Sequence, residues 1–129
     1  MKKPFLFLFL AVTALTSSCS GDDDNGGTTT GKSRNIKYEI TGNFSSKLDV
    51  TYITASGGAT NTEVTSLPWE MSFTADADSH GATFNASGIG QPGEKASLKI
   101  YQGGELKGTV DATAGSDGIL VAVGSTVTF

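Results

Sequence analysis

Two short stretches of this 129-residue sequence hold side chains that could do chemistry. The first surrounds Cys19, the only cysteine, which follows an apolar segment and precedes three aspartates. The second is "TADADSHGA", which holds the only histidine, His80, directly after Ser79. A thiol can be modified, and a serine with a histidine can act as nucleophile and base. Each chemistry needs particular neighbours, and the sequence supplies them at Cys19 but not at His80.

The stretch around His80 is predicted to be a polar turn. Adjacent side chains in an extended segment point to opposite faces, so His80 is poorly placed to act as a base for Ser79. Asp76 and Asp78 alternate as two calcium ligands could, but no EF-hand spacing and no bidentate glutamate follows. The chain also has no phosphate loop, cysteine cluster or nucleophile elbow. The sequence therefore predicts no catalytic residue, no metal site and no cofactor.

The segment before Cys19 is typical of a secretory signal. Lys2 and Lys3 are followed by about eleven mostly apolar residues, 5–15, and then by small polar residues. This apolar run is shorter than the ~20 residues that span a bilayer as a helix. At an ordinary signal cleavage site, Cys19 would be an unused thiol or half of an intermolecular disulfide.

Residues 15–19, "LTSSC", resemble a bacterial lipobox in which the leucine stands one place earlier than usual. The resemblance implies that residues 1–18 are a lipoprotein signal peptide and that Cys19 becomes an acylated N-terminus, with palmitate among its chains. Two or more acyl chains hold a protein firmly at a membrane, at ~0.8 kcal/mol per buried methylene. The expected partner of the N-terminus is therefore a membrane.

The residues after Cys19 resemble the export signal of Bacteroidetes-type lipoproteins that are sent to the outer face of the outer membrane. The resemblance rests on five consecutive residues: Ser20, Gly21, Asp22, Asp23 and Asp24. It implies an outer-membrane protein, anchored by lipid and facing the cell surface, whereas a simple solvated tether would also fit the periplasmic face. Aspartates next to an acylated end repel anionic headgroups, so the run should extend away from the membrane.

Charge and composition limit the partners and the number of domains. Without residues 1–18 the chain carries seven basic and thirteen acidic side chains, a net charge of −6. The lysines are scattered, so nucleic acid is not an expected partner. Residues 19–34 contain the lipidated cysteine and a linker rich in Gly, Thr and Asp. Residues 35–129 are predicted to form one domain, which has no cysteine and therefore no disulfide.

The domain is predicted to be all-β, a small antiparallel immunoglobulin-like β-sandwich of seven or eight strands. Apolar and polar residues alternate from residue 35 onward, and Gly- or Asn-rich stretches separate the segments. Trp69 is in step with Met71 and Phe73, which favours a place in the core, whereas Tyr101 is out of step with its apolar neighbours. "ILVAV" at residues 119–123 predicts a central strand covered on both faces, or a bulge at Gly124.

Several segments together resemble the extracytoplasmic domain of the mycobacterial membrane protein small (MmpS) family. They are "KYEITGN", "LDVTYITASGG", "SLPWEMSF", "ASLKIYQGGELKG" and "TAGSDG", which cover most of residues 36–129. The resemblance implies a small β-sandwich that serves as an accessory protein to a large lipid or siderophore exporter. This chain departs from the family in having a lipid anchor instead of a membrane helix, and in lacking the cysteine pair that members often carry.

These observations lead to one expected function and one alternative. The chain is expected to be a non-catalytic, lipid-anchored lipoprotein that is an accessory or binding component of a cell-envelope assembly. The alternative is a binder of a small lipid or glycan ligand at the cell surface. A deep apolar cavity between the sheets would favour the ligand, and a flat exposed edge or an apolar surface patch would favour a protein partner.

Overall fold

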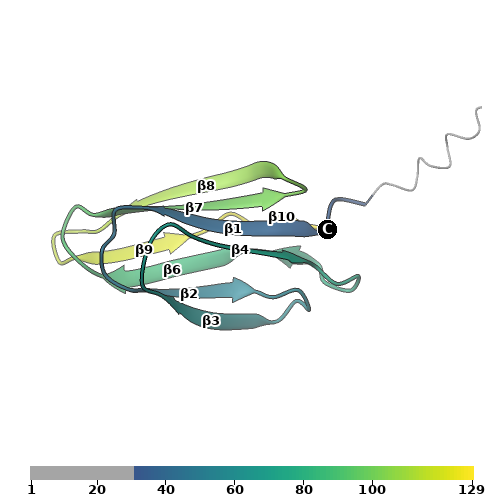
Figure 1. The fold of residues 1–129 in the computed structure, drawn as a ribbon, viewed down its shortest axis with the longest axis horizontal. Coiled ribbons are helices and arrows are strands. Elements are labelled where there is room, and N and C mark those ends of the chain that lie inside the picture. Colours follow the sequence, from purple (N-terminus) through teal and green to yellow (C-terminus); the bar gives the residue numbers. More distant parts are fainter. Residues whose placement is uncertain (1–30) are drawn as a thin grey trace, which may run out of the picture. The chain divides into compact units, whose positions relative to one another are not determined.

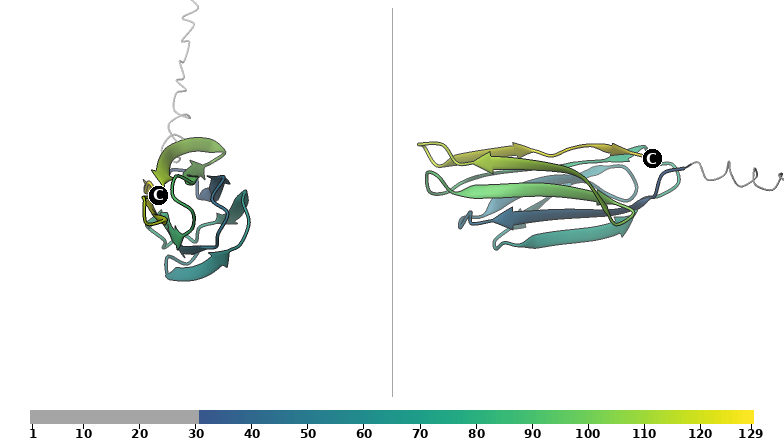
Figure 2. Two further views of the ribbon diagram at one scale, coloured as in Figure 1. Left: turned by 90° about the vertical axis from the view of Figure 1, so that its left-hand side faces the viewer. Right: turned by 90° about the horizontal axis from the view of Figure 1, so that it is seen from above.

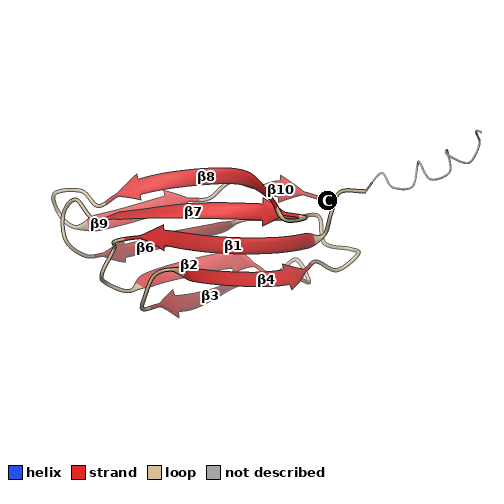
Figure 3. Cartoon of the chain, turned by 45° about the horizontal axis from the view of Figure 1, so that its top comes forward, coloured by secondary structure: helices blue, strands red, loops and turns tan. Residues whose placement is uncertain are grey.

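A computed structural model describes residues 31–129, in which ten β-strands run along the domain and no helix occurs (Figures 1 and 3). The strands are β1 (Asn35–Gly42), β2 (Leu48–Ile53), β3 (Ala59–Val64), β4 (Trp69–Thr74), β5 (Gly81–Ala82), β6 (Phe84–Ile89), β7 (Lys95–Gln102), β8 (Glu105–Thr113), β9 (Ile119–Val123) and β10 (Val127–Thr128). The predicted signal peptide, Cys19, the acidic run and the linker up to residue 30 lie outside the described residues.

The strands form two four-stranded sheets, seen as two layers in Figure 2. Sheet A has the order β4-β1-β7-β8, sheet B has the order β3-β2-β6-β9, and β5 pairs with β10. Every pairing is antiparallel. The predicted antiparallel β-sandwich is therefore confirmed. The number of strands exceeds the predicted seven or eight because β5 and β10 have only two residues each, too few to show an alternation of apolar and polar residues in the sequence.

Alternation along the strands places one apolar row of each sheet in the interior. The fully buried large side chains are Ile36, Tyr38, Ile40, Leu48, Val50, Phe84, Leu98, Ile100 and Leu120. Tyr38 from sheet A stacks on Phe84 from sheet B with 4.6 Å between ring centroids, so aromatic contact joins the two layers. The Tyr38 hydroxyl donates a hydrogen bond of 2.9 Å to the carbonyl of Ile53, which satisfies its polar end.

Trp69 lies on the inner face of sheet A, as predicted, but it is only half-buried. Its strand, β4, is a terminal strand of sheet A and pairs only with β1. Because nothing in the sheet flanks the other side of β4, the indole packs against the core without being enclosed. Met71 and Phe73 on the same strand are half-buried for the same reason.

The prediction that residues 119–123 are covered on both faces is wrong. Leu120 and Ala122 are buried, whereas Ile119, Val121 and Val123 are exposed. No register shift interrupts the pairing of β9 with β6, so Gly124 ends the strand instead of forming a bulge in it. A Cβ at Gly124 would lie 2.3 Å from the Phe84 carbonyl oxygen, which requires glycine at this close approach of the backbone.

The two ends of the described chain are fastened to each other at one end of the sandwich (Figure 1). The Arg34 guanidinium lies 4.9 Å from the centroid of the Phe129 ring, a cation–π contact. The Gln102 amide donates to the carbonyls of Ser33 and Thr128 at 2.9 and 3.0 Å. The segment that leads into β1 is therefore tied to the last strand, β10.

The buried phenol of Tyr38 predicts a loss of stability in alkaline solution. Burial raises the pKa of Tyr38 far above its usual value, because the interior disfavours the phenolate. The stabilisation from the neutral phenol is complete below the unfolded pKa of ~10 and is lost as the pH rises toward the folded pKa. The free energy of unfolding in urea should therefore fall more steeply above pH ~10 in the wild type than in Tyr38→Phe. Parallel curves for the two proteins would contradict this assignment.

Candidate protein-binding surface

An apolar stripe on the outer face of sheet B is the most unusual surface of the domain. It consists of Ile119, Val121 and Val123 on β9 and Ile89 on β6, and we call it the β9 stripe. Their exposed fractions are 46%, 62%, 66% and 70%, respectively. Ile89 pairs directly with Ile119 across the two strands, so the four side chains form a continuous row along the margin of the sheet. Contiguous exposed apolar side chains on a folded domain are typical of interaction sites.

The stripe exists because all five residues of β9 are apolar. In a strand, successive side chains point to opposite faces of the sheet, and only one face of sheet B meets the interior. Leu120 and Ala122 take that face, which leaves the other three residues of "ILVAV" in water. In the core strand β7, by contrast, the residues on the outward face are Lys95, Ser97, Lys99 and Tyr101, each of them polar or able to hydrogen-bond.

β9 also leaves part of its backbone without a partner strand. It is a terminal strand and pairs only with β6. The Gly90 amide donates to the Gly118 carbonyl, and the Gly124 amide donates to the Phe84 carbonyl, at 2.8 and 3.0 Å. Backbone groups alternate in direction along an antiparallel strand, so Leu120 and Ala122 also face β6. The amide and carbonyl groups of Val121 and Val123 therefore face the open edge.

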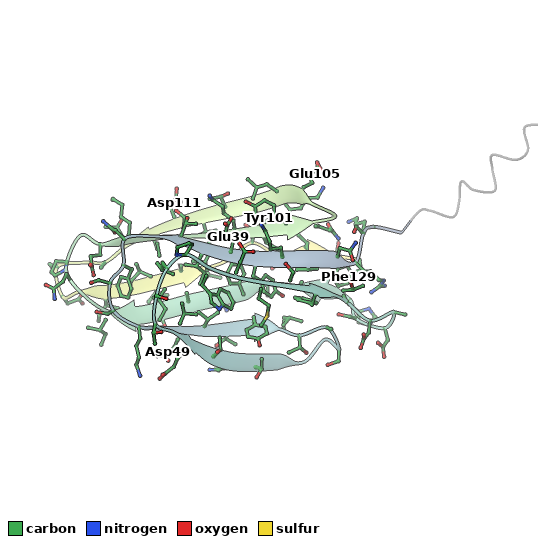
Figure 4. The ribbon with its side chains drawn as sticks, viewed as in Figure 1. Glu39, Asp49, Tyr101, Glu105, Asp111 and Phe129 are labelled. Atoms are coloured by element: carbon green, nitrogen blue, oxygen red, sulfur yellow. The ribbon has the colours of Figure 1, made fainter. Side chains whose placement is uncertain are left out.

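The other three terminal strands carry charges, which discourage pairing with a further strand. β3 has Glu63, which forms a salt bridge with Lys47 at 2.6 Å. β4 has Glu70, and β8 has Glu105, Lys107 and Asp111, with Glu105 and Asp111 marked in Figure 4. β9 has no charged residue and no proline. It is therefore the one terminal strand of the two sheets in the described domain without these protective features.

A second, polar candidate lies on the outer face of sheet A. Tyr101 on β7 donates a hydrogen bond of 2.9 Å to the Glu39 carboxylate on β1, and the two side chains lie side by side in Figure 4. The Lys37 ammonium lies 4.5 Å from the centroid of the Tyr101 ring. The hydrogen bond to Glu39 raises the pKa of Tyr101, since it favours the neutral phenol.

This polar site lies beside a depression of about 590 Å³ that is lined in part by Asn35, Lys37, Thr74 and Tyr101. The depression is on the outside of sheet A, whereas large apolar side chains fill the interior between the sheets. An aromatic ring flanked by amide, hydroxyl and ammonium groups could hold a sugar on an open surface. It offers little enclosed apolar volume for a lipid chain.

The stretch around His80 is a turn, as predicted, and it is held by Arg34. Ser79 is buried, and its hydroxyl has no hydrogen-bond partner in the described structure, whereas His80, Asp76 and Asp78 are exposed. The Arg34 guanidinium donates to the carbonyls of Asp76 and Ser79. A serine nucleophile has to be reachable by its substrate, and the burial of Ser79 does not fit that role. Within residues 31–129, no three His, Cys, Asp or Glu side chains are grouped to hold a metal ion.

Comparisons with known proteins add no constraint to these candidates. Neither a comparison with protein-family models nor a comparison with curated proteins gives a match to this chain. Among the residues that the structure describes, no helix is both long enough and apolar enough to cross a membrane.

The β9 stripe was not identified as a site from the sequence, although its signal is present there. The run "ILVAV" has five consecutive apolar residues, which fits a strand covered on both faces or a terminal strand with an exposed apolar face. The choice depends on the place of the strand in the sheet. That place is set by pairing between β6 and β9, which the local sequence does not encode.

Proposed function

We propose that this protein is a non-catalytic, lipid-anchored lipoprotein of the cell envelope that works by binding another protein through the β9 stripe. One observation carries the proposal: exposed apolar side chains lie in a row on a terminal strand that lacks protecting charges. Removing part of such a side chain from water contributes up to about 1 kcal/mol. The free backbone groups of Val121 and Val123 add hydrogen-bond donors and acceptors for an extended partner segment.

The anchor half of the proposal rests on the sequence. Cys19 after an apolar segment supports lipidation, and Asp22, Asp23 and Asp24 support export to the surface of the outer membrane. Residues 20–31, which precede the compact unit that begins at Lys32, would as a flexible linker hold the domain on the order of 20 Å from the lipid on average. An anchored domain of this kind meets other envelope proteins at short range. This setting, with the resemblance to the MmpS family, supports a role as an accessory component of an outer-membrane or transport assembly.

The alternative is a binder of a small glycan at the cell surface, and a separate observation favours it. Tyr101 presents a ring between Lys37 and Glu39 at the depression on sheet A. Aromatic faces with polar neighbours suit sugars. The site is open on one side, so such a ligand would bind weakly unless it extended over several sugar units.

The anchor is tested by labelling. Cells expressing the wild type and Cys19→Ala are given radioactive palmitate, with Ser17→Ala as the matched control. We expect label in the wild type and in the control but not in Cys19→Ala, because the thiol is the attachment atom. Equal label in Cys19→Ala and the wild type would contradict the lipoprotein assignment.

The binding surface is tested by photo-crosslinking in whole cells. A benzophenone amino acid replaces Val121 in one strain and Asn61 in another. Asn61 is the matched control because it is exposed on β3, at the opposite edge of the same sheet. We expect a protein adduct of defined mass from position 121 and none from position 61. If position 121 gives no adduct, or both positions give the same adducts, the β9 stripe is not the binding surface.

A further inference from the structure

We propose that the partner of the β9 edge is a second copy of this chain, and that the two β9 strands pair antiparallel about Ala122. The inference deepens the proposed function by naming the occupant of its surface. It uses only residues 32–129, which form a compact unit with its own core. Two observations support it. The first is the direction of the free backbone groups of β9, and the second is which of its side chains would lie opposite each other when two β9 strands pair.

The free backbone groups select one register. The backbone groups of Ile119 are already engaged, because its amide donates to the Asp117 carboxylate at 3.0 Å and its carbonyl accepts a hydrogen bond from the Gly115 amide at 3.0 Å. Val121 and Val123 are the remaining residues of β9 that face the edge. An antiparallel pair exchanges two hydrogen bonds between opposite residues. When Val121 of each copy lies opposite Val123 of the other, the two residue pairs form four hydrogen bonds. These bonds use the free amide and carbonyl groups of Val121 and Val123 in both copies.

The side chains fit the same register. Val121 of each copy lies opposite Val123 of the other on the outer face, and pairs of β-branched residues contribute roughly 0.2–1 kcal/mol each. Ala122 lies opposite Ala122 at the centre, where opposite Cα atoms are only ~4.5 Å apart, and a small residue suits this close approach. Residues 118–129 hold no charge, so like charges do not face each other when the strand pairs with itself.

A second copy also fits the narrow shape of the stripe. Apart from Ile89, the apolar side chains belong to the terminal strand, and the next outward residues on β6 are Ser87 and Asn85. Two copies joined edge to edge place their stripes side by side and convert the two four-stranded sheets B into one sheet of eight strands. Five paired residues per copy bury less than the ~1,200 Å² of a standard interface, so the dimer should be weak in dilute solution.

The first experiment measures the mass of residues 32–129 by sedimentation equilibrium from about 10 µM to about 1 mM, a range suited to weak association. The wild type should pass from monomer to dimer. Val121→Lys should stay monomeric yet folded, because its side chain points to solvent, whereas Asn61→Lys at the opposite edge should dimerise like the wild type. A wild type that stays monomeric at every concentration, or a Val121→Lys protein that dimerises equally well, would overturn the proposal.

The second experiment tests the register with disulfides, since residues 32–129 have no native cysteine. Val121→Cys and Val123→Cys proteins are oxidised separately and as a mixture. In the proposed register, opposite Cα atoms at positions 121 and 123 are ~5.5 Å apart, within the range of a disulfide. The mixture should give mainly the mixed dimer. A predominance of the Val121→Cys homodimer, or no faster coupling than with an Asn61→Cys control, would overturn the proposed pairing.

The mass of the in-cell adduct from position 121 shows whether a failure of this inference is also a failure of the proposed function. An adduct at twice the mass of the chain supports pairing between copies. A monomeric soluble domain together with an adduct to a different protein would overturn the second-copy proposal and leave the proposed function standing. Absence of any adduct would overturn the proposed function itself.

Discussion

The interior between the two four-stranded sheets has to stabilise this domain without a disulfide, because residues 31–129 contain no cysteine. Tyr38 and Phe84 stack at the centre and join one sheet to the other. The apolar rows on either side of them come from strands in which every second side chain points inward. Each strand has only one inward face, and this limit decides which residues the sandwich can bury.

That limit explains both the ordinary and the unusual surfaces of the domain. Along β1 and β7 the outward residues are polar or partly polar, among them Lys37, Glu39 and Tyr101, and they form contacts with each other across sheet A. Along β9 the outward residues are aliphatic, and they have no such contacts to make. The exposed apolar row and the free backbone edge occur on the same short strand. Their coincidence favours a strand-pairing partner over a small ligand.

The sequence predicted those features that depend on the local alternation of apolar and polar residues. Alternation indicated the strands and their inward residues, and the prediction of a β-sandwich rests on it. Two features depend on strand order, which local patterns do not contain. Trp69 is on the predicted face but is half-buried because β4 is terminal, and Val121 is exposed because β9 is terminal. Cys19 and its acidic run lie outside the described residues, so their roles rest on the sequence.

The open edge of β9 is tested most directly by hydrogen exchange of its backbone amides, followed residue by residue by NMR in residues 32–129. In dilute solution the amides of Val121 and Val123 should exchange far faster than those of Leu120 and Ala122, because only the latter are bonded to β6. Their exchange should slow as the protein concentration rises and the edge becomes paired. Equal protection of all four amides at low concentration would contradict an open edge. Exchange at Val121 and Val123 that stays fast at every concentration would contradict pairing through it.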